Sequence, residues 1–213
     1  MGDFSLDKNR ELMSEKHRAY FNEKAVIWDQ MMEHKPHEKL QEIFGTLEFE
    51  SGSTVLDVGT GTGVMLPLLK EIVGPSGKII AFDLAEEMLS LAKMKNGEEN
   101  IDYIQGDITA SPFKDNTFDV LICNSCFPHF LDQAASASEM ARILKPGGRV
   151  IICHLSSREE LNAMHRSLGG VVGNDLLPDK NEMMFMFEQA GFNVINIDDL
   201  DDRYILTANS MSI

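Results

Sequence analysis

The stretch Thr54–Pro67, which reads TVLDVGTGTGVMLP, decides the fold of the chain. Val55, Leu56 and Val58 form a short apolar run with β-branched residues, which is typical of a buried strand. Three glycines alternate directly after this run, at Gly59, Gly61 and Gly63. An apolar, helix-compatible segment follows them. This order predicts a strand, a tight glycine turn and a helix N-terminus whose unpaired N–H groups can face a polar ligand.

Strand and helix patterns alternate from this stretch onward. Further strands are expected at 78–82, 101–105, 118–123 and 149–153, with helices between them at about 64–73, 85–95 and 133–144. Two final strands, 193–197 and 203–208, are joined by the acidic segment DDLDD, which indicates an antiparallel hairpin. We therefore expect an α/β fold with a doubly wound, Rossmann-like sheet of seven strands. Six would be parallel and one antiparallel at an edge, with helices on both faces.

The residues before the first strand have a different pattern. Residues 7 to about 45 look helical and mostly polar, with one apolar stripe at helical spacing. Pro36 is expected to open a second helix and Gly45 to close it. We expect residues 1–50 to form a helical cap and residues 51–213 the α/β domain, together one compact unit.

Composition excludes some classes of function. The 213 residues carry a formal net charge of −15, which argues against binding to nucleic acid or to an anionic membrane, since both need basic surface. The first twenty residues lack the apolar region of a signal peptide, and no apolar run is long enough to cross a bilayer. The odd cysteine count, three, favours reduced thiols. We therefore expect a cytoplasmic protein.

Residues that directly follow the strands are the candidates for ligand binding, because ligands of open parallel sheets lie beyond the carboxyl ends of the strands. Asp83 ends the second strand, about 20 residues after the glycine turn, where an acidic residue can accept hydrogen bonds from a ribose diol. Asp107 and Ile108 follow the third strand, and a carboxylate beside an apolar residue suits an adenine. Each carboxylate could also be a helix cap or a solvated loop residue.

Together, VLDVGTGTG, the Asp83 strand end, GDITASPF, FDVLICN and LKPGG resemble the successive motifs of class I S-adenosylmethionine-dependent methyltransferases. The closest type is the small-molecule group that includes the ubiquinone/menaquinone C-methyltransferases. The specific motifs cover residues 54–155, and the resemblance implies a seven-stranded sheet whose last strand is antiparallel. The turn reads G-T-G-T-G and therefore differs from the G-x-G-x-x-G turn of dinucleotide-binding dehydrogenases.

The resemblance also implies roles in binding S-adenosylmethionine. The glycine turn would line the methionine part, through Gly59, Thr60, Gly61 and Gly63. Asp57 would lie near the amino group, Asp83 would hold the ribose hydroxyls, and Asn124 would lie near the methionine end. The adenine would contact Leu84, Asp107 and Ile108. The helices before residue 50 would cover the cofactor, with Tyr20, Phe21 and Trp28 as candidates for this lid.

Three histidines are expected on the side where a methyl acceptor must approach: His129, His154 and His165. Three interpretations remain open. One histidine, His129 or His154, is a general base, since imidazole titrates near neutral pH. Alternatively, two or three of them bind a divalent transition metal. In the third interpretation they are structural residues that hydrogen-bond to the backbone.

The remaining histidines and two cysteines have simpler interpretations. His17, His34 and His37 lie in polar segments and are expected on the surface. Cys126 and Cys153 lie near the acceptor rim, where they are either soft ligands or small packing residues.

The expected reaction is an in-line displacement that transfers a methyl group to a small-molecule acceptor. The sequence contains no motif for a covalent nucleophile. The alternative is a sensor or partner subunit that binds the cofactor without turnover. The oligomeric state is left open between a monomer and a homodimer.

Overall fold

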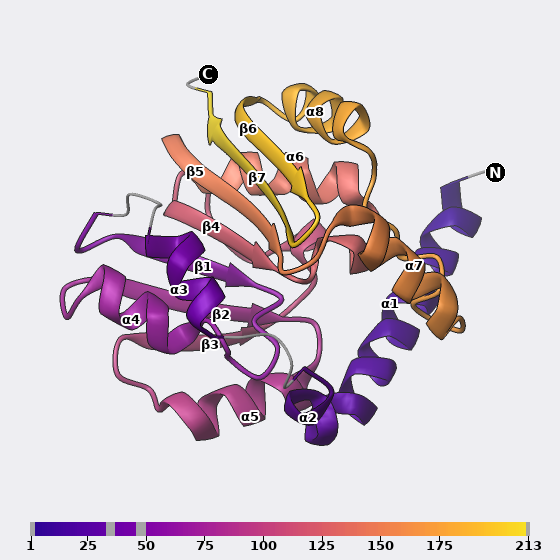
Figure 1. Ribbon diagram of the computed structural model, residues 1–213, viewed down its shortest axis with the longest axis horizontal. Coiled ribbons are helices and arrows are strands. Elements are labelled where there is room, and N and C mark those ends of the chain that lie inside the picture. The colour runs from indigo at the N-terminus through magenta and orange to yellow at the C-terminus, as the bar shows by residue number, and fades with distance from the viewer. Residues whose placement is uncertain (1–2, 33–36, 46–49, 212–213) are drawn as a thin grey trace.

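The computed structural model describes residues 3–32, 37–45 and 50–211. Seven strands form one sheet in the order β3-β2-β1-β4-β5-β7-β6 (Figure 1). The strands are β1 Thr54–Val58, β2 Lys78–Asp83, β3 Ile101–Gln105, β4 Phe118–Asn124, β5 Leu144–His154, β6 Phe192–Leu200 and β7 Arg203–Ser210. The α-helices are α1 Asp3–Lys24, α2 Trp28–Met32, α3 His37–Gly45, α4 Leu66–Val73, α5 Glu86–Asn96, α6 Gln133–Ile143, α7 Arg158–Leu168 and α8 Lys180–Gln189. Short 3₁₀ turns lie at η1 Ala25–Ile27, η2 Ile108–Ala110 and η3 Phe127–His129.

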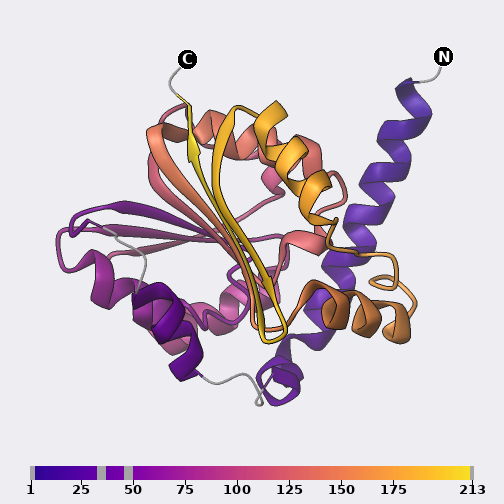
Figure 2. The same cartoon turned by 45° about the horizontal axis from the view of Figure 1, so that its top comes forward.

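The predicted antiparallel strand is confirmed, but its predicted place at the edge is wrong. β7 pairs antiparallel with both β5 and β6, so it lies between them and β6 is the edge strand. After β5 the chain passes through α7 and α8 to β6, which does not pair with β5. A strand position between β5 and β6 is therefore left open. The tight β6–β7 hairpin then fills that position (Figure 2). The KPGG segment, which we expected to be a turn, belongs to β5 as the structure has it.

Both faces of the sheet are buried, because neighbouring residues of a strand point to opposite sides. Leu56 and Val58 of β1 pack in one core cluster with residues of α6 and α8. Val55, on the other face, packs in a second cluster with residues of α3, α4 and α5. Figure 2 shows these two layers of helices on either side of the sheet. The sheet is therefore held rigid, and its strand ends are fixed points for side chains.

The glycine turn is bound to the end of β2. The N–H groups of Gly59 and Thr60 both donate to the carbonyl oxygen of Phe82, over 2.8 and 3.1 Å. Gly63 has a φ of +82°, and a Cβ atom there would lie 3.0 Å or less from Asn96, Leu66 and Ala92. Only glycine therefore allows both the left-handed backbone and the close packing of this turn on α5.

The N-terminal helix α1 crosses the carboxyl ends of the parallel strands (Figures 1 and 2). Arg18 donates two hydrogen bonds of 2.9 Å to Glu86 at the start of α5. The side chain of Asn22 accepts a 3.0 Å hydrogen bond from the backbone N–H of Glu87. These contacts fix one end of α1 on the α/β domain. Among the described residues, none of the helices is long and apolar enough to span a membrane.

We predict that Gly63→Ala lowers the free energy of unfolding by about 3 kcal/mol, because backbone strain adds to steric overlap with α5. Gly147→Ala is the matched control. Gly147 also has a positive φ, +76°, but a Cβ atom there meets nothing within 4 Å. It should cost only about 1 kcal/mol. Urea unfolding of both variants measures the difference, and equal losses would show that the packing on α5 contributes nothing.

Candidate functional site

A cavity of about 280 Å³ lies at the carboxyl ends of β1, β2, β3 and β4, beneath the N-terminal helices. The glycine turn forms its floor. One wall comes from the N-terminal residues Ser14, His17, Phe21, Trp28, Asp29 and Leu40. Another part of the wall comes from the segment after β4, through Ser125, Cys126, His129, Phe130 and Leu131. The cavity is therefore closed jointly by segments that are far apart in the sequence.

Two buried carboxylates lie on the cavity floor. Asp57 accepts a 2.7 Å hydrogen bond from the Thr60 hydroxyl, and burial raises its pKa to about 7. Asp83 accepts 2.8 and 2.9 Å hydrogen bonds from the N–H groups of Gly61 and Ala85. Burial also raises the pKa of Asp83, to about 6, against the effect of these hydrogen bonds. A cationic or hydrogen-bond-donating ligand would stabilise the ionised form of both groups.

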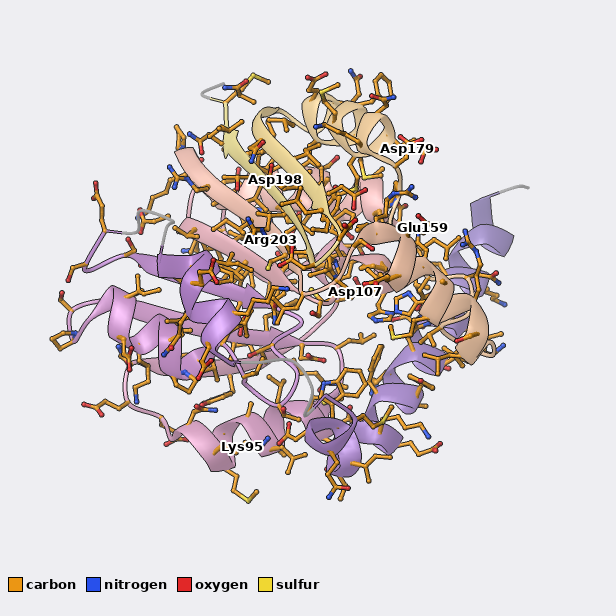
Figure 3. The ribbon with its side chains drawn as sticks, viewed as in Figure 1. Lys95, Asp107, Glu159, Asp179, Asp198 and Arg203 are labelled. Carbon is orange, nitrogen blue, oxygen red and sulfur yellow. The ribbon has the colours of Figure 1, made fainter. Side chains whose placement is uncertain are left out.

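The wall beyond β2 and β3 combines one carboxylate with apolar side chains. Asp107 accepts hydrogen bonds from the N–H and hydroxyl of Thr109, and a longer one of 3.4 Å from Ser14 on α1. Leu84 and Ile108 line the same wall. Figure 3 shows Asp107 near the centre of the view, on the side of the sheet that faces α1 and α7. This arrangement offers a flat ligand apolar contact beside a hydrogen-bond acceptor.

The segment after β4 holds an unsatisfied polar atom. Asn124 lines the cavity, and its buried Oδ1 atom has no hydrogen-bond partner in the described part of the chain. Ser125, the next residue, has a φ of +59°, which is uncommon for a residue other than glycine. Cys126 donates a 3.0 Å hydrogen bond to the carbonyl oxygen of Val58, and burial raises the pKa of its thiol. The thiol is thus a packing group under the glycine turn, whereas Asn124 has an acceptor to offer a ligand.

Three histidines converge on Asp175, in the loop between α7 and α8. Asp175 Oδ2 lies 2.7 Å from His129 Nδ1 and 3.0 Å from His17 Nε2. His165 Nδ1 bonds to the Asp175 carbonyl oxygen, and its ring centroid lies 4.9 Å from that of His129. Burial opposes ionisation of Asp175, but the bonds from the first two histidines lower its pKa to about 2. Asp175 is thus an ionised carboxylate that joins α1 to the cavity wall.

The structure does not place His154 with His129 and His165. His154 is fully buried at the end of β5, and its ring centroid lies 6.3 Å from that of Tyr204. The expected surface position of His17 is also wrong, since His17 is only 1% exposed. His34 lies outside the described residues, as does the side chain of His37.

The structure gives no support to the metal interpretation of His129, His154 and His165. Within the described ranges, no group of three or more His, Cys, Asp or Glu side chains could hold a metal ion. Cys153, the other soft ligand that we considered, is fully buried in the core beneath α3 and α4.

Two of the expected cofactor residues are not among the described residues that line the cavity. Gly63 packs on α5 instead, and Tyr20 contacts Phe21 and Lys24 on the outer side of α1. The other expected residues do line it: Asp57, Gly59, Thr60, Gly61, Asp83, Leu84, Asp107, Ile108, Asn124 and Trp28. Asp29, which the sequence did not single out, accepts a 2.6 Å hydrogen bond from the Thr62 hydroxyl. It thereby ties α2 to the glycine turn.

We predict that Asp175→Asn lowers the free energy of unfolding by about 2 kcal/mol at pH 7, because it removes charged hydrogen bonds inside the protein. The pKa of Asp175 is lowered, so its contribution is complete above the unfolded value of 3.8 and is lost as the pH falls toward 2. The deficit of the variant should therefore shrink below about pH 4. Denaturant unfolding between pH 7 and pH 3 measures it. The exposed Asp202→Asn is the control, and an equal effect of both variants would contradict the prediction.

Comparisons with known proteins agree with the fold. A model of the methyltransferase domain matches residues 56–152. The ubiquinone/menaquinone biosynthesis C-methyltransferase UbiE of Escherichia coli is 29% identical over 188 residues, which cover 76% of this chain and 72% of the relative.

Solved structures show the same fold. A putative methyltransferase from Haloferax volcanii, in complex with the Trm112 methyltransferase activator, matches with a TM-score of 0.79 and 22% identity, over 92% of this chain and 98% of that one. A SAM-dependent methyltransferase from Aquifex aeolicus matches with a TM-score of 0.69 and 26% identity, over 88% of this chain and 97% of that one. The motifs, the sheet order and these relatives agree: residues 56–152 match a methyltransferase domain, and the chain is similar to S-adenosylmethionine-dependent methyltransferases, UbiE among them.

Proposed function

We propose that the chain transfers the methyl group of S-adenosylmethionine to a small-molecule acceptor inside this cavity, with His129 as the general base. The observation that carries the proposal is the set of polar groups at the strand ends. Asp57, Asp83 and Asn124 come from three neighbouring strands, and all of them line one cavity. The unsatisfied Oδ1 atom of Asn124 and the buried carboxylates fit a ligand that donates hydrogen bonds.

Each part of the cofactor would have partners of matching chemistry. Asp83 uses one lone pair of each oxygen on Gly61 and Ala85, so both oxygens can still accept a bond from a ribose hydroxyl. Asp57 and Asn124 would receive the ammonium group. The adenine would lie against Leu84 and Ile108, with Asp107 accepting from its amino group. The methionine chain would run along Gly59, Thr60 and Gly61.

The charge of the cavity fits a cationic cofactor. Its described lining contains four aspartates (Asp29, Asp57, Asp83 and Asp107), of which Asp29 is paired with Lys95, and no lysine or arginine. S-adenosylmethionine would supply a methyl group on a positively charged sulfonium. The surrounding carboxylates favour binding of that charge, and the enzyme contributes to the rate mainly by holding the acceptor in line with the methyl group.

His129 is the best-placed group to remove a proton from the acceptor. Its Nδ1 atom is engaged by Asp175 at 2.7 Å, which fixes the ring and leaves Nε2 as the nitrogen that can serve the cavity. A carboxylate bonded to Nδ1 selects the tautomer with the lone pair on Nε2. Phe21 packs edge-on against the His129 ring, with 5.0 Å between the ring centroids. This contact helps to exclude water from the base.

The alternative function is a sensor that binds the cofactor without turnover. The ordered His129–Asp175 pair favours an enzyme, because a sensor has no need of an oriented base. The two functions differ in one measurable property, which is the formation of methylated product.

We predict that S-adenosylhomocysteine binds to the purified protein, and that Asp83→Asn weakens this binding at least tenfold, or about 1.4 kcal/mol, by removing the charged partner of the ribose. Asp119→Asn is the matched control. Asp119 lies on β4 at the opposite end of the sheet, where it pairs with Lys145 and the N–H of Thr54. Isothermal titration calorimetry measures both affinities, with thermal unfolding to verify that each variant folds. No binding by the wild-type protein would refute the proposed function.

We predict that His129→Gln lowers kcat about 10²- to 10⁴-fold, because glutamine keeps an N–H donor for Asp175 but cannot accept the proton. The assay follows transfer of a radiolabelled methyl group to a panel of small phenols, thiols and carbon acids. Affinity for S-adenosylhomocysteine should remain unchanged. His165→Gln, which alters the neighbouring ring, should have a much smaller effect. Full activity of His129→Gln would exclude His129 as the base, and a wild-type protein that binds the cofactor but methylates nothing would favour the sensor.

A further inference from the structure

His17 and His129 share one carboxylate oxygen, although they come from segments that are far apart in the sequence. His17 lies on α1, His129 lies in η3 after β4, and Asp175 lies in the loop between α7 and α8. Asp175 Oδ2 is 3.0 Å from His17 Nε2 and 2.7 Å from His129 Nδ1. Two imidazole rings therefore compete for the charge of a single buried carboxylate.

The partners of His17 determine its protonation state. Its Nδ1 atom lies 3.0 Å from the carbonyl oxygen of Met13, which can only accept a hydrogen bond. Its Nε2 atom faces Asp175, whose pKa of about 2 means that the carboxylate is ionised and also only accepts. Both ring nitrogens must therefore carry a hydrogen, and the ring is an imidazolium. Burial opposes this charge, but the bonds to Asp175 and Met13 raise the pKa of His17 above its ordinary value.

Among the described residues that contact the His129 ring, Asp175 alone is an anion. Besides Asp175, its ring contacts His165 on α7 and Phe21 on α1, with centroids 4.9 and 5.0 Å away. His165 Nδ1 is directed to the backbone carbonyl oxygen of Asp175. α1 makes two further contacts with carboxylates in this region. Arg10 forms a partly exposed ion pair of 3.4 Å with Asp132, and the Ser14 hydroxyl donates a hydrogen bond to Asp107. A second imidazolium at His129 would thus give the cluster two positive charges and one negative charge.

We propose that His17 is a positioning residue for methyl transfer: as an imidazolium it neutralises Asp175, so that His129 stays neutral and keeps a lone pair on Nε2. The proposal rests on the proposed role of His129 as the base. His17 acts only through Asp175, since both of its ring nitrogens are already engaged.

The test is the protonation state of each ring, measured by NMR on protein with ¹⁵N-labelled histidine. The six histidines are few enough for assignment by single substitution. In the wild-type protein at pH 7, we expect His17 to carry hydrogen on both nitrogens and His129 to carry it on Nδ1 only. In His17→Gln, which keeps a neutral N–H donor for Asp175, the ¹⁵N signals of His129 at pH 7 should shift toward those of the form with hydrogen on both nitrogens.

Arg18→Gln is the matched control, because it also removes a positive charge from α1, at the next residue. Arg18 pairs with Glu86 on α5 rather than with Asp175, so the ¹⁵N signals of His129 at pH 7 should not change. If His17→Gln does not fold, the wild-type spectrum alone decides, since a neutral His17 or a doubly protonated His129 at pH 7 overturns the proposal. Unchanged ¹⁵N signals of His129 in His17→Gln at pH 7 also overturn it. Calorimetry with S-adenosylhomocysteine on the same samples shows independently whether the proposed function holds.

Discussion

The buried carboxylate of Asp83 fixes the strand ends that line the cavity. It joins the end of β2 to the glycine turn after β1, through hydrogen bonds from the N–H groups of Gly61 and Ala85. Two hydrogen bonds from Gly59 and Thr60 to Phe82 reinforce the same junction. Burial makes ionisation costly, as the raised pKa of about 6 shows. Asp83 therefore has unused accepting capacity that a ribose hydroxyl would use.

The N-terminal helices complete a site that the sheet alone leaves open. Thr62 and Asp29 fix α2 to the glycine turn, and Arg18 and Glu86 fix α1 to α5. Asp175 also fixes the C-terminal half of α1, through His17. The floor of the cavity carries carboxylates, which favour a cationic ligand. The N-terminal helix α1 instead places a cationic side chain, His17, beside a carboxylate, Asp175. In our proposal, the carboxylates of the floor bind the cofactor, and the His17–Asp175 pair keeps the base, His129, neutral.

The sequence predicted the parts of the site that depend on sheet topology. Asp83, Asp107 and Asn124 each follow a strand, and parallel strands necessarily bring such residues to the same edge. It did not predict Asp175, because the loop between α7 and α8 has no periodicity from which its position could be read. The predicted surface position of His17 was wrong for a related reason. Its helix is mostly polar, and only the tertiary contact with Asp175 makes one polar position buried.

Strand alternation explains the position of His154. It lies two residues after Ile152 and so faces the same core, where Tyr204 packs, rather than the cavity. The misplaced edge strand has a different origin, since a hairpin fixes which strands pair but not which of them joins the sheet. The sequence pattern therefore predicts that β6 and β7 are antiparallel, whereas long-range packing determines the order β5-β7-β6 at this edge of the sheet.

The most direct test of the account is a crystal structure of the protein with S-adenosylhomocysteine. We expect the ribose hydroxyls within hydrogen-bond distance of Asp83, the amino group near Asp57 and Asn124, and the sulfur facing the side of the cavity that holds His129. A cofactor bound in this cavity but with its sulfur directed away from His129 would contradict the proposed base. A cofactor bound elsewhere would contradict the account as a whole.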